Sequence, residues 1–409
     1  MVPVFNVEKE KEDNVAKNSI LVSILLFAFI SNGYGAEIRG YYSLTGGYDS
    51  NPLINDVPLE SAIMRNSLGI GYFPEESLFE ISYTGSAISF LNIPERNYQV
   101  HNIKTDYTFQ PFTYQYFEIE TSAIGKLRNN SVDGLLYNYA EINPELSFVL
   151  YSDIGIVSLA YTPSFTRFCN YPGLSNSQNE LILSLDKTFE FETNLIAEAT
   201  YGTRNYFNVN QPLNSPPSPN GKGMKYRHFS NSQNNRQLPN SVFTNQLTNI
   251  VDFSLGLSHP ISTEIDIGIT GNFNIHLNDD GLYYASGSTD LFNEREFFND
   301  YYNFEEKAIT IETKYRFSDN ISMKANYIYY NRDFLYSLSL IDYRYSSEEN
   351  RKDSGNLISG EIKYEVAEYF SIFSKMTLNF KIDYFANDSN LKEYTYESAS
   401  IMISTIWDF

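Results

Sequence analysis

The segment Ile265-Asp266-Ile267-Gly268-Ile269-Thr270-Gly271-Asn272-Phe273-Asn274-Ile275-His276 places an apolar side chain at nearly every second position. Polar side chains fill most of the positions between them. Successive side chains of a β-strand point to opposite faces, so this pattern predicts a strand with one apolar and one polar face. The same alternation recurs at 251–257, 309–317, 361–366 and 378–385.

The length of the alternating segments distinguishes a barrel from a soluble sandwich. Many run for ten residues or more, whereas strands of globular proteins usually have about five or six. We therefore predict an all-β fold, a single transmembrane antiparallel β-barrel of about 16 strands (14–18). The predicted strands are 37–48, 63–73, 77–91, 97–110, 114–127, 135–150, 153–168, 177–188, 190–206, 241–258, 262–278, 303–317, 320–334, 354–367, 370–386 and 393–409.

The predicted connections alternate between short and long. Tight turns such as 74–76, 151–153 and 318–320 are expected on the periplasmic side, and long loops such as 207–240 and 279–302 on the extracellular side. Barrels of the bacterial outer membrane have this asymmetry.

The last predicted strand alternates as well, with Ile401, Ile403, Trp407 and Phe409 on one face. A terminal aromatic residue on an amphipathic last strand resembles the C-terminal signature of Gram-negative outer-membrane β-barrel proteins. The resemblance implies that Ile403, Trp407 and Phe409 belong to an insertion signal read by the barrel-assembly machinery. It also implies that outer-membrane lipids and lipopolysaccharide surround the barrel, and it is compatible with an oligomer.

The opposite end of the chain predicts export. Residues 20–30 form an apolar run of secretory type, followed by small residues up to Ala36. The run is shorter than the roughly 20 residues of a membrane-spanning helix. We expect residues 1–36 to be a secretory signal peptide, cleaved near Gly35 or Ala36, and residues 37–409 to form the barrel in the bacterial outer membrane. The alternative is an uncleaved anchor helix.

Composition narrows the class of partner. The chain has 34 Tyr and 30 Phe and a net charge of −21. Abundant aromatic residues suit strands and membrane-interface girdles. So acidic a chain offers no basic patch for phosphates, which excludes nucleic acid as an expected partner. Cys169 is the single cysteine, so there is no disulfide framework.

Charged residues of both signs occupy the polar faces of the predicted strands. They cannot face lipid without a cost of about 2–4 kcal/mol for a basic residue at the midplane, so they predict a hydrated lumen. The leading hypothesis is a porin-like pore through which small hydrophilic solutes diffuse, or an export conduit. The predicted pore-lining residues are Lys104, Asp106, Glu118, Glu120, Glu312, Lys314, Arg316, Lys381 and Asp383.

The segment 207–240 is basic in an otherwise acidic chain. If it folds into the lumen, its cations would oppose acids such as Glu118, Glu120 or Glu312 and create a transverse field. The predicted constriction residues are Lys222, Lys225, Arg227 and Arg236.

A second hypothesis is an enzyme. The run His228-Phe229-Ser230-Asn231 resembles the catalytic motif of outer-membrane phospholipases and lipid A deacylases. The resemblance implies Ser230 as nucleophile and His228 as general base of a lipid ester hydrolase, because residues two apart share a strand face. Asn240, Asn245 or Asp252 would orient the histidine. The leading hypothesis does not require an enzyme.

A third hypothesis is a surface-exposed structural or adhesive barrel. Residues 46–52 also resemble the first-strand segment of barrels for surface-protein assembly or exopolysaccharide export. No cofactor is expected, and no H-x₃-H spacing suggests a metal. Oxygen-rich loops could bind Ca²⁺ through Asp49, Asn51, Asp56 and Glu60, or through Asp279, Asp280, Asp290 and Asp300.

Overall fold

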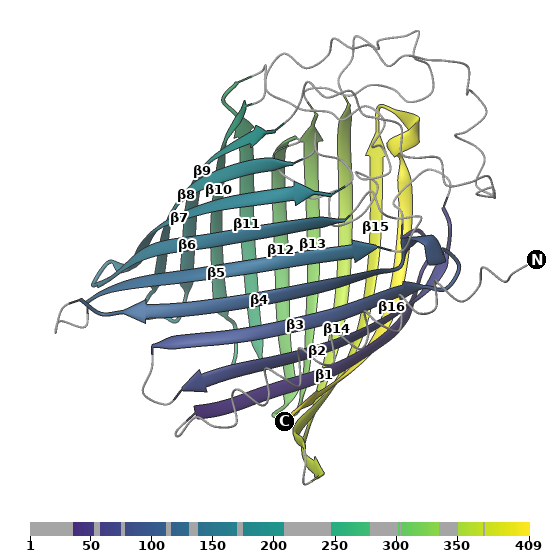
Figure 1. The fold of residues 1–409 in the computed structure, drawn as a ribbon, viewed down its shortest axis with the longest axis horizontal. Coiled ribbons are helices and arrows are strands. Elements are labelled where there is room, and N and C mark those ends of the chain that lie inside the picture. Colours follow the sequence, from purple (N-terminus) through teal and green to yellow (C-terminus); the bar gives the residue numbers. More distant parts are fainter. Residues whose placement is uncertain are drawn as a thin grey trace, which may run out of the picture.

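The structure is a computed structural model. It describes residues 36–52, 58–74, 78–111, 116–130, 138–169, 175–207, 247–278, 302, 304–334, 351–370 and 373–409. Within these residues, sixteen antiparallel strands close into one barrel (Figure 1). The predicted fold class, a single antiparallel barrel of sixteen strands, is confirmed.

The strands follow one another around the barrel in chain order. They are β1 Ala36–Asp49, β2 Ser61–Pro74, β3 Phe79–Phe90, β4 Tyr98–Phe109, β5 Phe117–Asn130, β6 Tyr139–Ser152, β7 Gly155–Phe168, β8 Asn176–Thr188, β9 Asn194–Tyr206, β10 Leu247–Pro260, β11 Ile265–His276, β12 Glu305–Ser318, β13 Ile321–Asp333, β14 Lys352–Phe370, β15 Phe373–Ser389 and β16 Tyr396–Asp408. Two short 3₁₀ turns, η1 Pro94–Arg96 and η5 Lys392–Tyr394, lie in the connections before β4 and β16. No helix among the described residues is long and apolar enough to cross a membrane.

Closure of the barrel pairs β1 with β16. Tyr42 lies opposite Trp407 in the register, and their rings stack with centroids 5.6 Å apart. Gly40 and Phe409 exchange two backbone hydrogen bonds of 2.8 Å. The last strand therefore pairs on both sides, and the sheet has no open edge with unpaired backbone groups.

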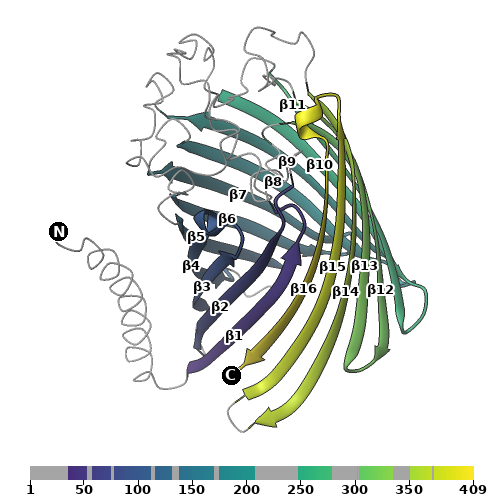
Figure 2. The same ribbon diagram turned by 90° about the vertical axis from the view of Figure 1, so that its right-hand side faces the viewer.

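The connections differ between the two ends of the barrel. The turns 153–154, 261–264 and 319–320 lie at the end where β1 begins and β16 finishes (Figure 2). The longest connections, 207–246 and 277–304, belong to the opposite end. The short–long alternation has one weak point, since 110–116 is no shorter than 91–97.

The outward face of the wall is apolar. Large apolar side chains there remain exposed, for example Leu183 at 52%, Leu255 at 55% and Ile358 at 52%. A 13-residue strand such as β8 is about 44 Å long, and a tilt of about 40° gives it a height of about 34 Å. That height exceeds the apolar band of about 25 Å of outer-membrane barrels.

The inward face contains a small packed cluster near the end with the long connections. Tyr330, Phe385 and Tyr396 are buried there against Ala308 and Leu357. The hydroxyl of Tyr330 donates a hydrogen bond of 2.7 Å to the side chain of Asn387. Aromatic side chains therefore pack over the inner surface of β13–β16 at this end of the barrel.

Candidate functional site

The predicted pore-lining residues lie on the face opposite the exposed apolar side chains. Lys104 and Asp106 alternate with Ile103 and Tyr107, which are exposed on the outside, and Lys104 pairs with Asp106 at 2.9 Å. Residues that are paired across neighbouring strands point to the same face, so the register extends this inward and outward assignment around the barrel. It places the whole set on the inner face: Lys104, Asp106, Glu118, Glu120, Glu312, Lys314, Arg316, Lys381 and Asp383.

Several inward acids of β12–β16 are neutralised by neighbouring cations. Glu312 binds Lys314 at 3.0 Å and Lys324 at 2.5 Å. The same arrangement recurs at Glu365, which lies 2.5 Å from Lys363 and 2.8 Å from Lys375. We call this side, β12–β16, the paired half. Because Glu312 already forms ion pairs with two lysines of β12 and β13, it is less available to pair with a cation of the segment 207–240, as the predicted transverse field requires.

The inward face of β6–β11 is acidic, and we call it the acidic wall. Its described inward positions hold one lysine or arginine, Arg204 on β9. Neutral side chains are among the partners of its acids: Asn143 donates to Glu141 at 2.5 Å, and the Tyr302 hydroxyl donates to Glu180 at 3.2 Å. The acids of the wall are Glu141, Glu145, Glu180, Asp186, Glu198, Asp252 and Asp266.

Four arginines at the end with the long connections lie over aromatic rings. The guanidinium carbons lie 3.7–4.3 Å from the ring centroids, within the range of cation–π attraction. The pairs are Arg128 with Tyr98, Arg204 with Tyr302, Arg332 with Phe304 and Tyr330, and Arg351 with Phe334 and Tyr394. We call this set the mouth arginines.

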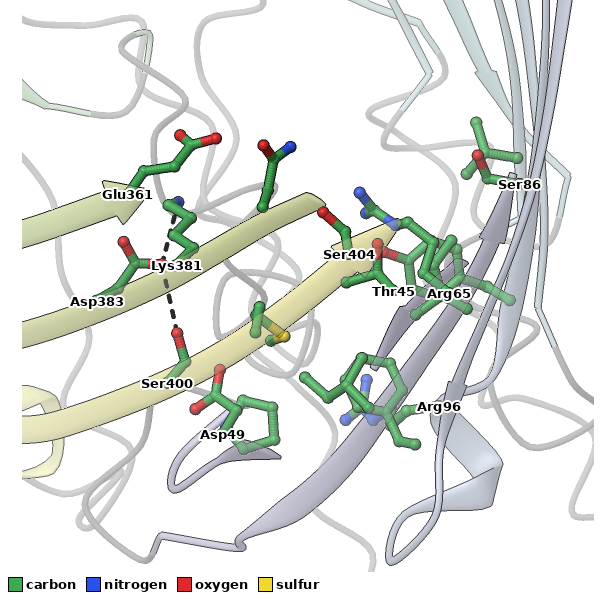
Figure 3. A pocket seen from close by; sticks show the side chains of 18 of the residues that line it. Thr45, Asp49, Arg65, Ser86, Arg96, Glu361, Lys381, Asp383, Ser400 and Ser404 are labelled. Atoms are coloured by element: carbon green, nitrogen blue, oxygen red, sulfur yellow. Dashed lines mark hydrogen bonds and ion pairs between the residues drawn. The ribbon is translucent and has the colours of Figure 1, made fainter. Parts of the chain in front are cut away.

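A cavity of about 790 Å³ opens on the inner face where the first and last strands meet. Figure 3 shows Glu361 and Asp383 on one side of it and Arg65 on the other. Asp383 accepts from Lys381 at 3.1 Å and from the Ser400 hydroxyl at 3.3 Å. Of the nine predicted pore-lining residues, Lys381 and Asp383 line this cavity, whereas Arg65 and Glu361 line it without having been predicted as site residues.

The loop-based predictions lie largely outside the described residues. The constriction residues Lys222, Lys225, Arg227 and Arg236 belong to 208–246, as do the hydrolase candidates His228, Ser230, Asn240 and Asn245. Asp252 is described, and it sits on the inner face of β10. Both the constriction and the hydrolase therefore stay predictions.

The first connection, 50–60, and the adjoining Asp49 were predicted to bind Ca²⁺, but the described carboxylates there accept hydrogen bonds from neighbouring residues. Asp49 accepts from the backbone of Asn51 and from the Ser398 hydroxyl, both at 2.9 Å. Glu60 accepts from the Tyr48 hydroxyl. No three His, Cys, Asp or Glu side chains converge on a metal-binding position in the described part of the chain. Asp56 and the acids of 279–300 lie outside it, so a loop-bound Ca²⁺ stays a prediction.

The residues of the predicted insertion signal share the outer face of β16. Ile403 is 58% exposed, Trp407 stacks on Tyr42, and the Phe409 ring lies over Gly40. A side chain at position 40 would collide with that ring, so the glycine allows the close approach. Recognition of these residues by an assembly machinery stays a prediction.

No family model matches the chain, and no curated protein does. Among solved structures, it is similar to OccD3 (OpdP) of Pseudomonas aeruginosa, with 8% identity, a TM-score of 0.49 and coverage of 92% of each chain. The outer membrane protein opdK of the same organism has 8% identity and a TM-score of 0.49, covering 91% of this chain and 99% of that one. OccAB1 of Acinetobacter baumannii has 9% identity and a TM-score of 0.45, covering 93% and 99%. Similarity at this level concerns the fold alone, so function has to be inferred from the side chains of this chain.

Proposed function

We propose that the protein is a passive pore for small hydrophilic solutes in the outer membrane of a Gram-negative bacterium. The observation that carries the proposal is the two-faced wall, which is apolar outside and charged inside around the closed barrel. Ionised side chains such as Glu312, Lys314 and Lys381 require water or counter-charges, and a hydrated lumen supplies both. Solutes would cross by diffusion through that water.

The outer face supports placement in a membrane. Contiguous exposed apolar surface on a soluble monomer rarely exceeds a few hundred Å². Here exposed leucine, isoleucine, phenylalanine and tyrosine side chains occur on strands all around the barrel. Lipid would cover this surface, and lipopolysaccharide would do so at the end with the long connections. Residues 1–36 would act as the export signal, and Ile403, Trp407 and Phe409 would serve insertion by the barrel-assembly machinery.

The acidic wall supports a preference for cations. Its acids face the lumen, and Arg204 is the one lysine or arginine on the described inner face of β6–β11. In the paired half, by contrast, lysines neutralise Glu312 and Glu365. Fixed charge of one sign in a low-dielectric channel concentrates counter-ions. We therefore expect cations to permeate faster than anions of the same size.

Single-channel recording of the refolded protein in a planar bilayer tests the pore. We expect steady ohmic steps, and a reversal potential in a KCl gradient that favours K⁺. Barrel folding is checked by heat-modifiable migration on a gel and by the β-type circular dichroism signal. Folded protein that carries no current would contradict the proposed function.

Cys169 allows a test of orientation with the natural sequence. The thiol is exposed at the end of the barrel with the long connections. If those connections face the medium, a bulky membrane-impermeant maleimide should label Cys169 on intact cells. The matched control is Asn320→Cys in a Cys169→Ser background, which lies in the turn 319–320 and should be labelled only after the outer membrane is permeabilised. The reverse pattern would invert the orientation.

A further inference from the structure

The cavity between the first and last strands contains two charges of opposite sign that have no partner among the described residues. Arg65 on β2 and Glu361 on β14 both line it. Neither makes a hydrogen bond, ion pair or ring contact with any residue that the structure describes. Lys381 lies opposite Glu361 in the register, but it binds Asp383 instead. Arg96 and Lys126 also line the cavity and are engaged by other residues, Lys126 by the ring of Tyr139 among them, whereas Arg65 and Glu361 are available to a ligand.

The two free charges are too far apart along the wall to pair with each other. The register runs from Arg65 to Thr45, then through Ser404 and Asn379 to Lys363, which is two residues from Glu361 on β14. Four steps between strands amount to about 19 Å along the curved wall. Both side chains point into the cavity, so the remaining gap is comparable with two or three residues of extended peptide, about 7–10 Å.

Apolar side chains gather on the arginine side of the cavity, where Ser86, Arg96, Asn102 and Lys126 also line it, and the glutamate side is mostly polar. Ile88 is directly opposite Arg65 in the register, and Ile63 is opposite Phe90. All of these side chains line the cavity, and Ile88 is 4% exposed. On the other side the lining includes Asn379, Ser400 and Ser404. A ligand that fits this arrangement carries an apolar group beside its anionic end.

We propose that this cavity binds short zwitterionic peptides, of two or three residues, on their way through the pore. The C-terminal carboxylate would bind the Arg65 guanidinium, whose fork of donors matches a carboxylate. The N-terminal ammonium would bind the carboxylate of Glu361. An apolar C-terminal side chain would contact Ile63, Ile88 and Phe90. A cavity of about 790 Å³ is within the usual range of small-molecule sites. This inference rests on the proposed pore, because the site faces its lumen.

Calorimetric titration of the full barrel in detergent with the peptide Ala-Ala-Leu tests the site without requiring conduction. N-acetylated and C-amidated Ala-Ala-Leu each lack one charge, and we expect each to bind at least about tenfold more weakly. Leu-Ala-Ala has the same composition and charges, and we expect it to bind about fivefold more weakly because its leucine meets the polar side. Equal affinity for all four peptides would overturn the proposal.

Two conservative variants assign the contacts. Arg65→Gln and Glu361→Gln should each weaken Ala-Ala-Leu binding by about tenfold or more and remove the discrimination against the peptide that lacks the corresponding charge. The matched control is Glu120→Gln, which removes an inward charge outside this cavity and should leave the affinity unchanged. Unchanged affinity in both site variants, with folding verified, would overturn the site.

The same peptides in bilayer recordings separate the two proposals. Current interruptions by Ala-Ala-Leu that shorten in Arg65→Gln would support both. Open channels together with no calorimetric binding would leave the pore standing and refute the peptide site. Binding that depends on Arg65 and Glu361 in a barrel that conducts no current would support the site and refute the pore.

Discussion

The acidic wall of β6–β11 and the paired half of β12–β16 line one lumen and join where β11 pairs with β12, yet they handle charge in opposite ways. In the paired half, Glu312 and Glu365 each lie between two lysines on neighbouring positions of the wall. In the acidic wall, Asp252 has Glu180, Glu198 and Glu306 among its neighbours, and Asn274 as a polar one. The strands of both regions alternate in the same way, although β14 and β15, with 19 and 17 residues, are longer than any strand of the acidic wall.

This difference in charge pairing shows that strands of one architecture can serve either stability or ion selection. Ion pairs between adjacent strands fix side chains and leave little net field, so the paired half is suited to stability. An excess of acids over cations on the described strands keeps a net field in the lumen at some cost in repulsion, so the acidic wall is suited to ion selection. Each of the following experiments changes one half and uses the other half, or a neighbouring residue, as the reference.

The largest effect is expected at the mouth of the paired half. The side chains of Arg351 and Asp353 are 8% and 0% exposed, and Arg351 Nε donates to both carboxylate oxygens at 2.9 and 3.0 Å. Arg351→Ala would leave a buried carboxylate unpaired and remove two ring contacts, so we expect a loss of about 3–5 kcal/mol in the free energy of unfolding. Urea unfolding in lipid vesicles measures it. The neighbouring Lys352→Ala, at an exposed pair of 3.9 Å with Asp333, should cost less than about 1 kcal/mol.

The next effect concerns selectivity and belongs to the acidic wall. The quadruple variant Glu180→Gln, Glu198→Gln, Asp252→Asn and Asp266→Asn removes four inward acids of the acidic wall. The inner face of β6–β11 holds one described lysine or arginine, Arg204, and Lys314 of β12 lies opposite Asp266 in the register. We expect the K⁺/Cl⁻ permeability ratio to fall by about fivefold, equivalent to about 1 kcal/mol. Reversal potentials in a KCl gradient measure the ratio. An unchanged ratio would show that the described wall does not select ions.

A smaller effect compares the same substitution in the two halves. Glu312→Gln breaks two partly exposed ion pairs, so it should lower the free energy of unfolding by about 0.5–1 kcal/mol. Glu198→Gln relieves repulsion from nearby acids and should leave stability unchanged or raise it by a few tenths of a kcal/mol. Both values come from urea unfolding under one set of conditions. Equal destabilisation by the two variants would remove the distinction between the halves.

The smallest effect is the response of selectivity to salt. The Debye length falls from about 10 Å at 0.1 M to about 3 Å at 1 M. We therefore expect the cation preference of the natural protein to fall about twofold over that range, while the quadruple wall variant stays nearly constant. Reversal potentials at a fixed tenfold gradient and different mean concentrations check this. A salt-independent preference would point to size or loops as the source of selection.

The fold could be predicted because alternation in a barrel strand directly reflects the two solvents on its two sides. Every one of the sixteen predicted segments overlaps a strand of the structure. Boundaries were less well predicted where turn residues continue the alternation. Residues 190–193 were assigned to a strand, but Phe189 and Thr193 close a turn in which Glu192 has φ +62°. Residues 262–264 likewise belong to a turn, since Ile261 and Ile265 are bonded across it.

The candidate site could be predicted only in part. The parity of alternation is sufficient to place Lys381 and Asp383 on the inner face, and it would also have placed Arg65 and Glu361 there. The sequence does not show which charges form ion pairs. Glu312, for example, meets Lys324 only because β12 pairs with β13 in this register. The contrast between the two halves arises from such pairings across strands.

The seam between β1 and β16 gives the protein an optical signal of its own. Trp407 is the single tryptophan of the sequence, and it stacks on Tyr42 of the first strand. Its emission therefore reports one event, the meeting of the last strand with the first. Stopped-flow fluorescence of the unlabelled chain should resolve barrel closure from the earlier growth of the sheet, and brominated lipids should quench the same emission once the seam is in the bilayer.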